Sequence, residues 1–254
     1  MDKQIESSVV DGVLKVTLNR PEKRNPLSQS VLETLKATFV EHADNHHIRV
    51  AVIRGAGDAA FAAGGDLVDL AKIRTEDATR TMHELGYSAL EAVRSFPLPV
   101  IAALNGDALG GGAELAVAAD IRIAARHARI GFLQSKLNIT TAWGGATDLI
   151  DLIGRHRALQ LLISAEVLSS DRAMQMGIYD ACAEADDDFD DFIDAMTARY
   201  AHASAHVLRA YKAIALETRD NTRAQLLPRS ETDGFVAAWV HDDHWTKADK
   251  ALKK

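Results

Sequence analysis

The chain has 254 residues, of which 47% are hydrophobic and 26% are charged, as is typical of a globular protein with a sizeable core. Its net charge of −7, without a Lys/Arg-rich block, argues against a nucleic-acid-binding protein. No apolar run approaches the ~20 residues that span a bilayer, the N-terminus lacks a signal-peptide pattern, and the ten histidines show no metal-binding spacing. Cys182 is the single cysteine and cannot form an internal disulfide. We therefore expect a cytoplasmic protein with no metal, no membrane partner and no nucleic-acid partner.

The N-terminal part is predicted to form a hairpin, a helix and a strand. Apolar runs at 5–10 and 13–18 flank Asp11-Gly12, and this dipeptide between apolar runs is a strong hairpin signal. Residues 28–43 carry apolar side chains at helical spacing, and residues 50–54 form a short apolar run typical of a buried strand.

The central part alternates predicted strands, glycine-rich turns and helices. A helix is expected over 67–95, with an interruption near 72–75, and Pro97 and Pro99 stop it. Further strands are expected at 100–104, 121–124 and 128–132. The order strand, glycine turn, helix occurs twice at a spacing of about 45 residues, which favours a repeated ββα unit in an α/β fold.

The chain is predicted to be almost wholly helical from Gly144 onward. The helices expected there from apolar periodicity are 146–153, 157–164, 171–176, 189–201, 205–217 and 231–240. A helical C-terminal third of this kind often packs against a partner subunit.

Two glycine-rich segments, 61–66 and 105–114, are the most informative feature of the sequence. Each follows an apolar strand-like run and leads toward a helix-like pattern, so each presents free backbone N–H groups. Two such N–H groups that converge on one point would hold an oxyanion. Glu114 follows Gly111 by three residues and therefore returns to the same helix face. An oxyanion site beside a carboxylate suits chemistry on a carbonyl compound, especially through an enolate.

Several segments together resemble the crotonase, or enoyl-CoA hydratase/isomerase, superfamily. They are both glycine-rich segments, the early loop Asn19–Leu27, Trp143-Gly144-Gly145, Leu168–Ala173 and Gly177-Ile178. The resemblance covers most of the chain, and it implies a crotonase-type ββα spiral core at 1–195 followed by a helical trimerisation region at 196–254. It also implies a homotrimer, or a hexamer built as a dimer of trimers. The expected substrate is an acyl-CoA thioester, and no separate cofactor is implied because coenzyme A is part of the substrate.

The resemblance further implies roles for individual residues. Gly65 and Gly111 match the family's two oxyanion-binding N–H groups, and Glu114 matches a catalytic glutamate. The pair Lys23-Arg24 matches the loop that meets the phosphates and the adenosine of coenzyme A. Three more residues match the strand and turn along which the pantetheine arm runs, namely Ala63, Asp66 and Leu67.

One position departs from the two catalytic glutamates of the family's hydratases. Aligned on residues 137–145, the family's second glutamate position falls on Gln134, whose amide can orient water but cannot accept or give a proton in the working pH range. A shift of the alignment by two residues would place Lys136 there instead, and no shift within two residues offers a carboxylate. The surroundings of Gln134 and the Trp143 motif resemble the branch that decarboxylates short alkylmalonyl-CoA thioesters. Decarboxylation yields an enolate directly and needs no activated water. Apolar surroundings from the substrate-binding candidate Trp143 and from Phe132 would favour loss of the carboxylate charge.

The main prediction is therefore a lyase that stabilises a thioester enolate and decarboxylates a short alkylmalonyl-CoA. The alternatives are 2-enoyl-CoA hydration and a non-catalytic acyl-CoA-binding protein that has kept the fold. The site residues also have purely structural interpretations. Glu114 can be a first-turn acid that satisfies a helix dipole, Gln134 a polar residue at a strand end, and Trp143 a core side chain.

Overall fold

The computed structural model describes residues 3–226 and 229–252, without the side chains of Leu67 and of residues 220–230. The strands of the larger sheet, in spatial order, are β1 (Ile5–Val10), β2 (Val13–Leu18), β3 (Val50–Gly55), β5 (Val100–Leu104), β7 (Ile121–Ala124) and β10 (Ala181–Cys182). Those of the smaller sheet are β4 (Ala60–Ala62), β6 (Asp107–Leu109), β8 (Ile130–Gly131) and β9 (Val167–Leu168). Neighbouring strands are parallel except in the pairs β1–β2 and β8–β9.

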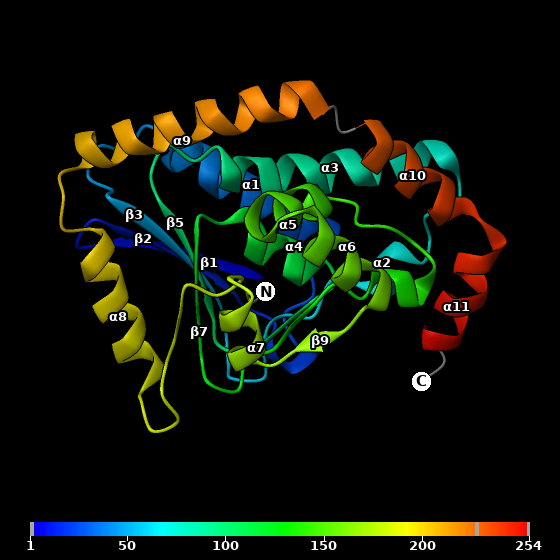
Figure 1. Cartoon of the computed structure of the whole chain (residues 1–254), viewed down its shortest axis with the longest axis horizontal. Helices are drawn as coiled ribbons and strands as arrows, with labels where there is room; N and C mark the ends of the chain where they lie inside the picture. Colours follow the sequence, from blue (N-terminus) through cyan, green and yellow to red (C-terminus); the bar gives the residue numbers. More distant parts are fainter. Residues whose placement is uncertain (1–2, 227–228, 253–254) are drawn as a thin grey trace.

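Helices surround both sheets (Figure 1). The first group is η1 (Pro21–Lys23), α1 (Gln29–His42), α2 (Leu67–Leu70), α3 (Glu76–Arg94), α4 (Gly111–Ala118), η2 (Gln134–Leu137) and α5 (Gly145–Ile153). The second group is α6 (Arg155–Ser164), α7 (Ser170–Gln175), α8 (Phe189–Tyr200), α9 (Ala205–Leu226), α10 (Arg229–Val240) and α11 (Asp242–Leu252).

The repeated ββα unit is confirmed and determines where the glycine-rich turns lie. Strands β3, β5 and β7 of the larger sheet are each followed by a strand of the smaller sheet, β4, β6 and β8, and then by helices. Because β4, β6 and β8 are parallel neighbours, the turns that leave their carboxyl ends lie at one edge of the smaller sheet. Segments that are distant in the sequence are thereby brought to one place.

The two faces of the larger sheet bury different apolar clusters, because alternate strand residues point to opposite faces. Ile53 and Ala102 belong to the main core, whereas Val52 and Ile101 belong to a second cluster with Ile193 of α8. Figure 1 accordingly shows α8 apart from α1 and α3. This division explains why β5 is apolar along its whole length and β3 is apolar from Val50 to Ile53.

The N-terminal predictions are confirmed in detail. Strands β1 and β2 form an antiparallel hairpin, and Asp11 and Gly12 between them have φ of 50° and 82°. These positive values are what an Asp-Gly turn accommodates. Ser28 is the N-cap of α1, and its hydroxyl accepts a hydrogen bond from the N–H group of Val31 over 3.4 Å.

Some predicted boundaries are wrong. The strand predicted over 128–132 keeps only Ile130–Gly131. The C-terminal part is almost wholly helical, as predicted, but the two-residue strands β9 and β10 and helix α11 were not predicted. A strand of two residues is too short to show the alternation of apolar and polar residues by which strands are predicted.

The C-terminal helices return over the rest of the chain. Helix α9 lies along α1 and α3 in Figure 1, and ion pairs of Lys212 with Asp120 and of Arg219 with Glu91 hold it there. Helices α10 and α11 then descend beside α2 and α3. The predicted domain division at 195 falls within α8, and this division and the oligomeric state stay predictions. In the described part of the chain, no helix has the length and apolarity that a membrane span needs.

Candidate active site

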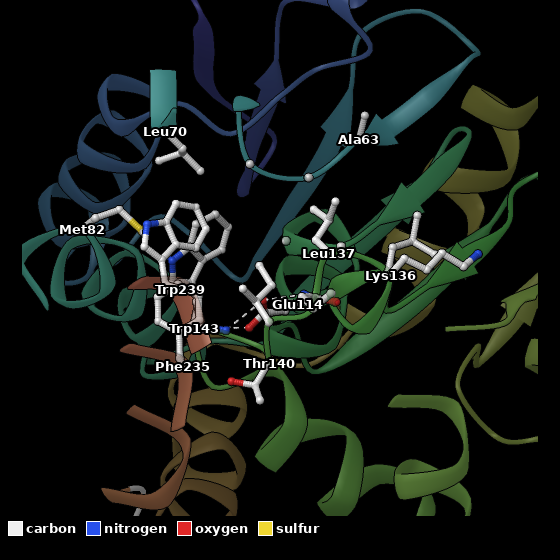
Figure 2. A pocket seen from close by; sticks show the side chains of 18 residues that line it. Ala63, Leu70, Met82, Glu114, Lys136, Leu137, Thr140, Trp143, Phe235 and Trp239 are labelled. Carbon is white, nitrogen blue, oxygen red and sulfur yellow. Dashed lines mark hydrogen bonds between the residues drawn. The ribbon is translucent and has the colours of Figure 1, made fainter. Parts of the chain in front are cut away.

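A cavity of about 260 Å³ lies between the glycine-rich turns, the turn before α5 and helix α10 (Figure 2). Its wall is mostly apolar and includes Leu70, Met82, Trp143, Phe235 and Trp239. Glu114 is the one carboxylic acid among the described residues that line it. The cavity therefore combines a small apolar volume with a single acidic group.

Gly65 and Gly111 both line this cavity. Gly111 is the first residue of α4, so its N–H group has no acceptor within the helix. No hydrogen bond from the N–H group of either glycine occurs within residues 3–226 and 229–252. The two groups are thus available to an oxygen atom in the cavity, which is the property that an oxyanion-binding pair requires. Their catalytic role stays a prediction.

Other glycines of the two segments are required by close backbone packing. Gly64 has φ of 103°, and a Cβ there would lie 3.0 Å from the carbonyl oxygen of Leu109. A Cβ on Gly112 would lie 2.0 Å from the carbonyl oxygen of Ala62. The glycine pattern therefore serves two ends: it lets β4 and α4 approach each other, and it leaves N–H groups exposed to the cavity.

Glu114 is 1% exposed, and four donors surround its carboxylate. Oε1 accepts hydrogen bonds from the side-chain amide of Gln134 (2.8 Å) and the N–H group of Ala142 (3.3 Å). Oε2 accepts from the N–H groups of Trp143 (2.8 Å; Figure 2) and Gly145 (3.1 Å). Because a carboxylate offers about four lone-pair positions, these donors fix the orientation of the group.

The ionisation of Glu114 is strongly perturbed. Burial, together with the negative charge of Glu231, raises the pKa of Glu114 to about 7 from its ordinary value of 4.5. The backbone N–H donors of Trp143, Ala142 and Gly145 oppose this effect. A carboxyl group with a pKa near 7 is present in both protonation states at neutral pH, so it can both accept and donate a proton.

Gln134 begins η2 and is 9% exposed. Its Nε2 donates to Glu114, whereas its Oε1 is buried and has no hydrogen-bond partner among the described residues. A buried acceptor of this kind is normally satisfied by water or by a ligand. Gln134 therefore presents an open acceptor beside the acidic group.

The indole of Trp143 forms one wall of the cavity and is also part of the core. A Cβ on Gly86 of α3 would lie 2.0 Å from its Nε1, and a Cβ on Gly111 would lie 2.3 Å from its Cζ3. The ring thus rests on two glycines, and both the binding and the packing interpretations fit it. Phe132 is buried, but its predicted place in the wall is wrong, since the neighbouring Leu133 lines the cavity instead.

The turn that carries these donors is held from α3 by Arg94. This buried side chain donates from Nε to Asp148 (2.8 Å) and from Nη2 to the carbonyl oxygen of Trp143 (2.5 Å). Because the acceptors lie on both sides of the α5 N-terminus, Arg94 fixes how the turn enters the helix.

An open groove of about 880 Å³ meets the cavity at Ala63 and Gly65, which line both. Lys23 and Asp66 also line the groove, and Asp66 forms an ion pair with Arg20 (2.9 Å). A long ligand can therefore extend from the groove into the cavity past Ala63.

Two other predicted coenzyme A contacts, Arg24 and Leu67, are not among the described residues that line the groove. The Arg24 guanidinium is directed at Asp107, with Nη2 and Oδ2 2.9 Å apart, and Asp107 also pairs with Arg129 (2.7 Å). Leu67 begins α2, but its side chain lies outside the described residues. All five predicted contacts to coenzyme A stay predictions.

Helix α10 supplies residues that the sequence analysis did not assign to the site. Phe235 and Trp239 line the cavity, and their spacing of four residues on a helix was the available signal of a shared face. Nε1 of Trp239 donates to the carbonyl oxygen of Ile73 (2.9 Å), which anchors α10 beside the cavity. Glu231, one turn earlier, contacts the turn before α5, and no local pattern predicted that contact.

The site therefore joins two free N–H groups, one carboxyl group with a near-neutral pKa, and an open amide acceptor around a small apolar cavity. Such an arrangement can stabilise an oxyanion and transfer a proton close to it.

Comparison with known proteins places these features in a family context. The family model described as enoyl-CoA hydratase/isomerase matches residues 8–243. The crotonyl-CoA hydratase of Syntrophomonas wolfei is 37% identical over 161 residues, which cover 63% of this chain and 62% of that protein. The short-chain-enoyl-CoA hydratase of Clostridium acetobutylicum is 34% identical over 172 residues, which cover 68% of this chain and 66% of that protein. The chain thus spans less than two thirds of the length of these curated relatives.

Solved structures show the same fold. An enoyl-CoA hydratase from Bacillus anthracis superposes with a TM-score of 0.80 at 30% identity, covering 99% of this chain and 96% of that one. An enoyl-CoA hydratase/isomerase from Xanthobacter autotrophicus Py2 gives a TM-score of 0.90, covering 99% and 94%. At 22% identity, the second likeness concerns the fold alone.

Proposed function

The chain belongs to the enoyl-CoA hydratase/isomerase family, and we propose that it adds water reversibly to a short-chain 2-enoyl-CoA thioester. The names of the two relatives above support hydration over the decarboxylation favoured by the sequence. One observation carries the proposal: Glu114, with its pKa raised to about 7, lies in the same cavity wall as the free N–H groups of Gly65 and Gly111.

The thioester carbonyl oxygen binds to the N–H groups of Gly65 and Gly111 in this proposal. The coenzyme A portion lies in the open groove that contains Lys23, and the acyl portion enters the cavity past Ala63. Met82 and Trp239 bound the cavity, whose volume of about 260 Å³ suits a short acyl chain. Apolar walls exclude bulk water, so the two N–H groups act on the oxygen atom in a low-dielectric environment.

Water addition then needs a single carboxyl group. Glu114 as the carboxylate accepts a proton from a water molecule while the water oxygen bonds to Cβ of the enoyl group. The electron pair of the double bond moves onto the thioester oxygen, and the resulting enolate is held by Gly65 and Gly111. Glu114 returns a proton to Cα, the carbonyl re-forms, and the net change is H and OH added across the double bond.

The hydrogen-bond donors around Glu114 determine where the attacking water can bind. The longest of its four hydrogen bonds, from the N–H group of Ala142 at 3.3 Å, is the one that a proton of the attacking water most easily replaces. The open Oε1 of Gln134 accepts a hydrogen bond from the other O–H group of that water. Gln134 thus orients the water and leaves the proton transfer to Glu114.

Decarboxylation of a short alkylmalonyl-CoA is the second candidate. It is favoured by the presence of an amide, and not a second carboxyl group, at residue 134. Among the described residues that line the cavity, Glu114 has no second carboxylate beside it, because Gln134 takes that position. Loss of CO₂ leaves an enolate on the same two N–H groups and needs only one proton donor, a role that protonated Glu114 can fill.

A side-by-side turnover assay separates the two candidates. Crotonyl-CoA, methylmalonyl-CoA and ethylmalonyl-CoA are each supplied to the purified protein, and products are identified by mass spectrometry. We expect water addition to crotonyl-CoA that Glu114→Gln abolishes and that Asp171→Asn, at an exposed surface ion pair, leaves unchanged. CO₂ release without hydration would replace the first candidate by the second. Acyl-CoA binding without either reaction would reject both.

A further inference from the structure

The turn between η2 and α5 is held between two carboxyl groups from distant parts of the chain. Glu114 of α4 binds its N–H groups from the cavity side, as described above. Glu231 of α10 accepts hydrogen bonds from the hydroxyl groups of Thr141 (2.5 Å) and Thr147 (2.9 Å). Thr141 is 2% exposed, so its hydroxyl makes this contact inside the protein.

The two carboxyl groups share one helix end. The N–H group of Gly145, the first residue of α5, donates to Glu114 over 3.1 Å. The N–H group of the next residue, Ala146, lies 3.4 Å from Oε1 of Glu231 and 3.3 Å from the hydroxyl of Thr141. A helix N-terminus stabilises negative charge through its free N–H groups and its dipole. Consecutive N–H groups of one turn therefore connect Glu231 to Glu114.

We propose that Glu231 is a positioning residue of the active site, which holds through Thr141 and Thr147 the turn whose N–H groups orient Glu114. The inference rests on the proposed role of Glu114 in proton transfer. Glu231 is not among the residues that line the cavity, so it acts through the turn and does not touch the substrate. The C-terminal helical region thus takes part in the chemistry of the core.

The charge of Glu231 gives this residue a second effect on Glu114. The like charge contributes to raising the pKa of Glu114, after burial. Other charged or titratable groups near the turn lie on α3 and α5, and Lys136 of η2 lines the same cavity as Glu114. On α3, burial lowers the pKa of His83, and the charges of Glu84 and Arg80 act on it in opposite directions. On the opposite side of the turn, Arg94 is paired with Asp148.

The first experiment measures the titration of Glu114 without using turnover. Isotope-labelled glutamate carboxyl groups are followed by NMR against pH, and the Glu114 signal is assigned by its loss in Glu114→Gln. In Glu231→Gln, which keeps the size and one acceptor, we expect the pKa of Glu114 to fall below about 7. Asp233→Asn is the matched control, because it removes an equal charge two residues away on α10 from an exposed side chain that pairs with Arg80.

The second experiment tests positioning by hydrogen bonds alone. Thr147→Val preserves the shape of the side chain and removes one bond to Glu231, whereas Thr147→Ser restores the hydroxyl. We expect Thr147→Val to lower kcat several-fold with little change in KM, and Thr147→Ser to recover most of the loss. A purely structural role would lower the amount of folded protein without this split.

The outcomes separate the inference from the proposed function. An unchanged Glu114 titration in Glu231→Gln, or a shift as large in Asp233→Asn, would overturn the role of Glu231 even if hydration is observed. A shift specific to Glu231→Gln supports that role even if crotonyl-CoA is not hydrated, because the titration needs no substrate. If Glu231→Gln does not fold, Thr147→Val with kcat equal to that of the unmodified protein would overturn the inference.

Discussion

The side-chain amide of Gln134 donates a hydrogen bond of 2.8 Å to the carboxylate of Glu114 inside the cavity. The amide oxygen faces the same region and has no partner among the described residues. A second carboxyl group at this position would repel the first, whereas the amide fixes one oxygen of Glu114 and keeps an acceptor free. Residue 134 therefore decides whether the cavity has one carboxyl group or two.

Replacing Gln134 by glutamate should convert the site to a coupled pair of carboxyl groups. Two carboxyl groups at hydrogen-bond distance cannot both ionise, so the pair should retain one proton at neutral pH. Because a general acid or base is typically worth ~10²–10⁴ in rate, we expect kcat for crotonyl-CoA hydration to rise by about tenfold or more. Gln134→Leu, which lacks both donor and acceptor, should lower kcat. A Gln134→Glu variant slower than the unmodified protein would contradict the expectation that a second carboxyl group at this position assists hydration.

Replacing Glu114 by glutamine should remove the proton carrier. We expect kcat to fall by ~10²–10⁴ for whichever of the two candidate reactions is observed. The new NH₂ group cannot accept hydrogen bonds, so at least one buried N–H group of the turn loses its acceptor, at a cost of about 1–3 kcal/mol in the free energy of unfolding. Steady-state kinetics and urea denaturation measure the two effects. Turnover above one tenth of the original rate would exclude Glu114 as the proton carrier.

The pKa of Glu114 also predicts a dependence of stability on pH. The folded protein holds the proton up to about pH 7, whereas the unfolded chain releases it near 4.5, so the folded state binds more protons between these values. The contribution of Glu114 to stability is therefore present below pH 4.5 and is lost as pH rises through 7. The loss amounts to about 3 kcal/mol. The difference in unfolding free energy between the unmodified protein and Glu114→Gln should shrink accordingly as the pH rises. A difference that is constant from pH 5 to pH 8 would be inconsistent with a raised pKa.

The sequence predicted the parts of the site that depend on local backbone pattern. Gly65, Gly111 and Glu114 stand in segments whose turn and helix signals are strong, and the structure brings these segments to one cavity. Glu231 and Trp239 could not be predicted in the same way, because their place depends on how α10 returns across the fold after α9. Such a return is determined by long-range packing, which periodicity does not encode.

The contrast between local sequence signals and long-range packing also explains which strands were not predicted. Ser28 and the Asp11-Gly12 turn carry their own conformational signals, and the elements beside them were predicted closely. Strands β9 and β10 have two residues each and exist because a neighbouring strand offers free backbone groups. Their formation is a consequence of the fold and not of their own side chains.

We predict that Gly86 is needed to leave room for the indole of Trp143, and that helix α3 itself does not need a glycine there. Alanine is ordinarily more stable than glycine inside a helix by roughly 0.5–1 kcal/mol. A Cβ on Gly86, however, would lie 2.0 Å from Nε1 of Trp143, so Gly86→Ala must displace the indole. We expect a net destabilisation of about 1–3 kcal/mol, as for other overpacked cores, and a loss of activity because the N–H group of Trp143 binds Glu114. Gly234→Ala is the control, since a Cβ on Gly234 of α10 meets no atom within 4 Å and should stabilise the protein slightly.

A double-variant cycle links the effect of Gly86→Ala to the ring of Trp143. Phenylalanine at 143 is smaller than tryptophan and leaves room for the added methyl group. The cost of Gly86→Ala in unfolding free energy should therefore be smaller in the Trp143→Phe background than in the unmodified protein, which is the non-additivity expected of residues in contact. Equal costs in the two backgrounds, measured by urea denaturation, would mean that the methyl group is accommodated by a shift of α3. In that case Gly86 would have no part in placing the indole of Trp143 against Gly111.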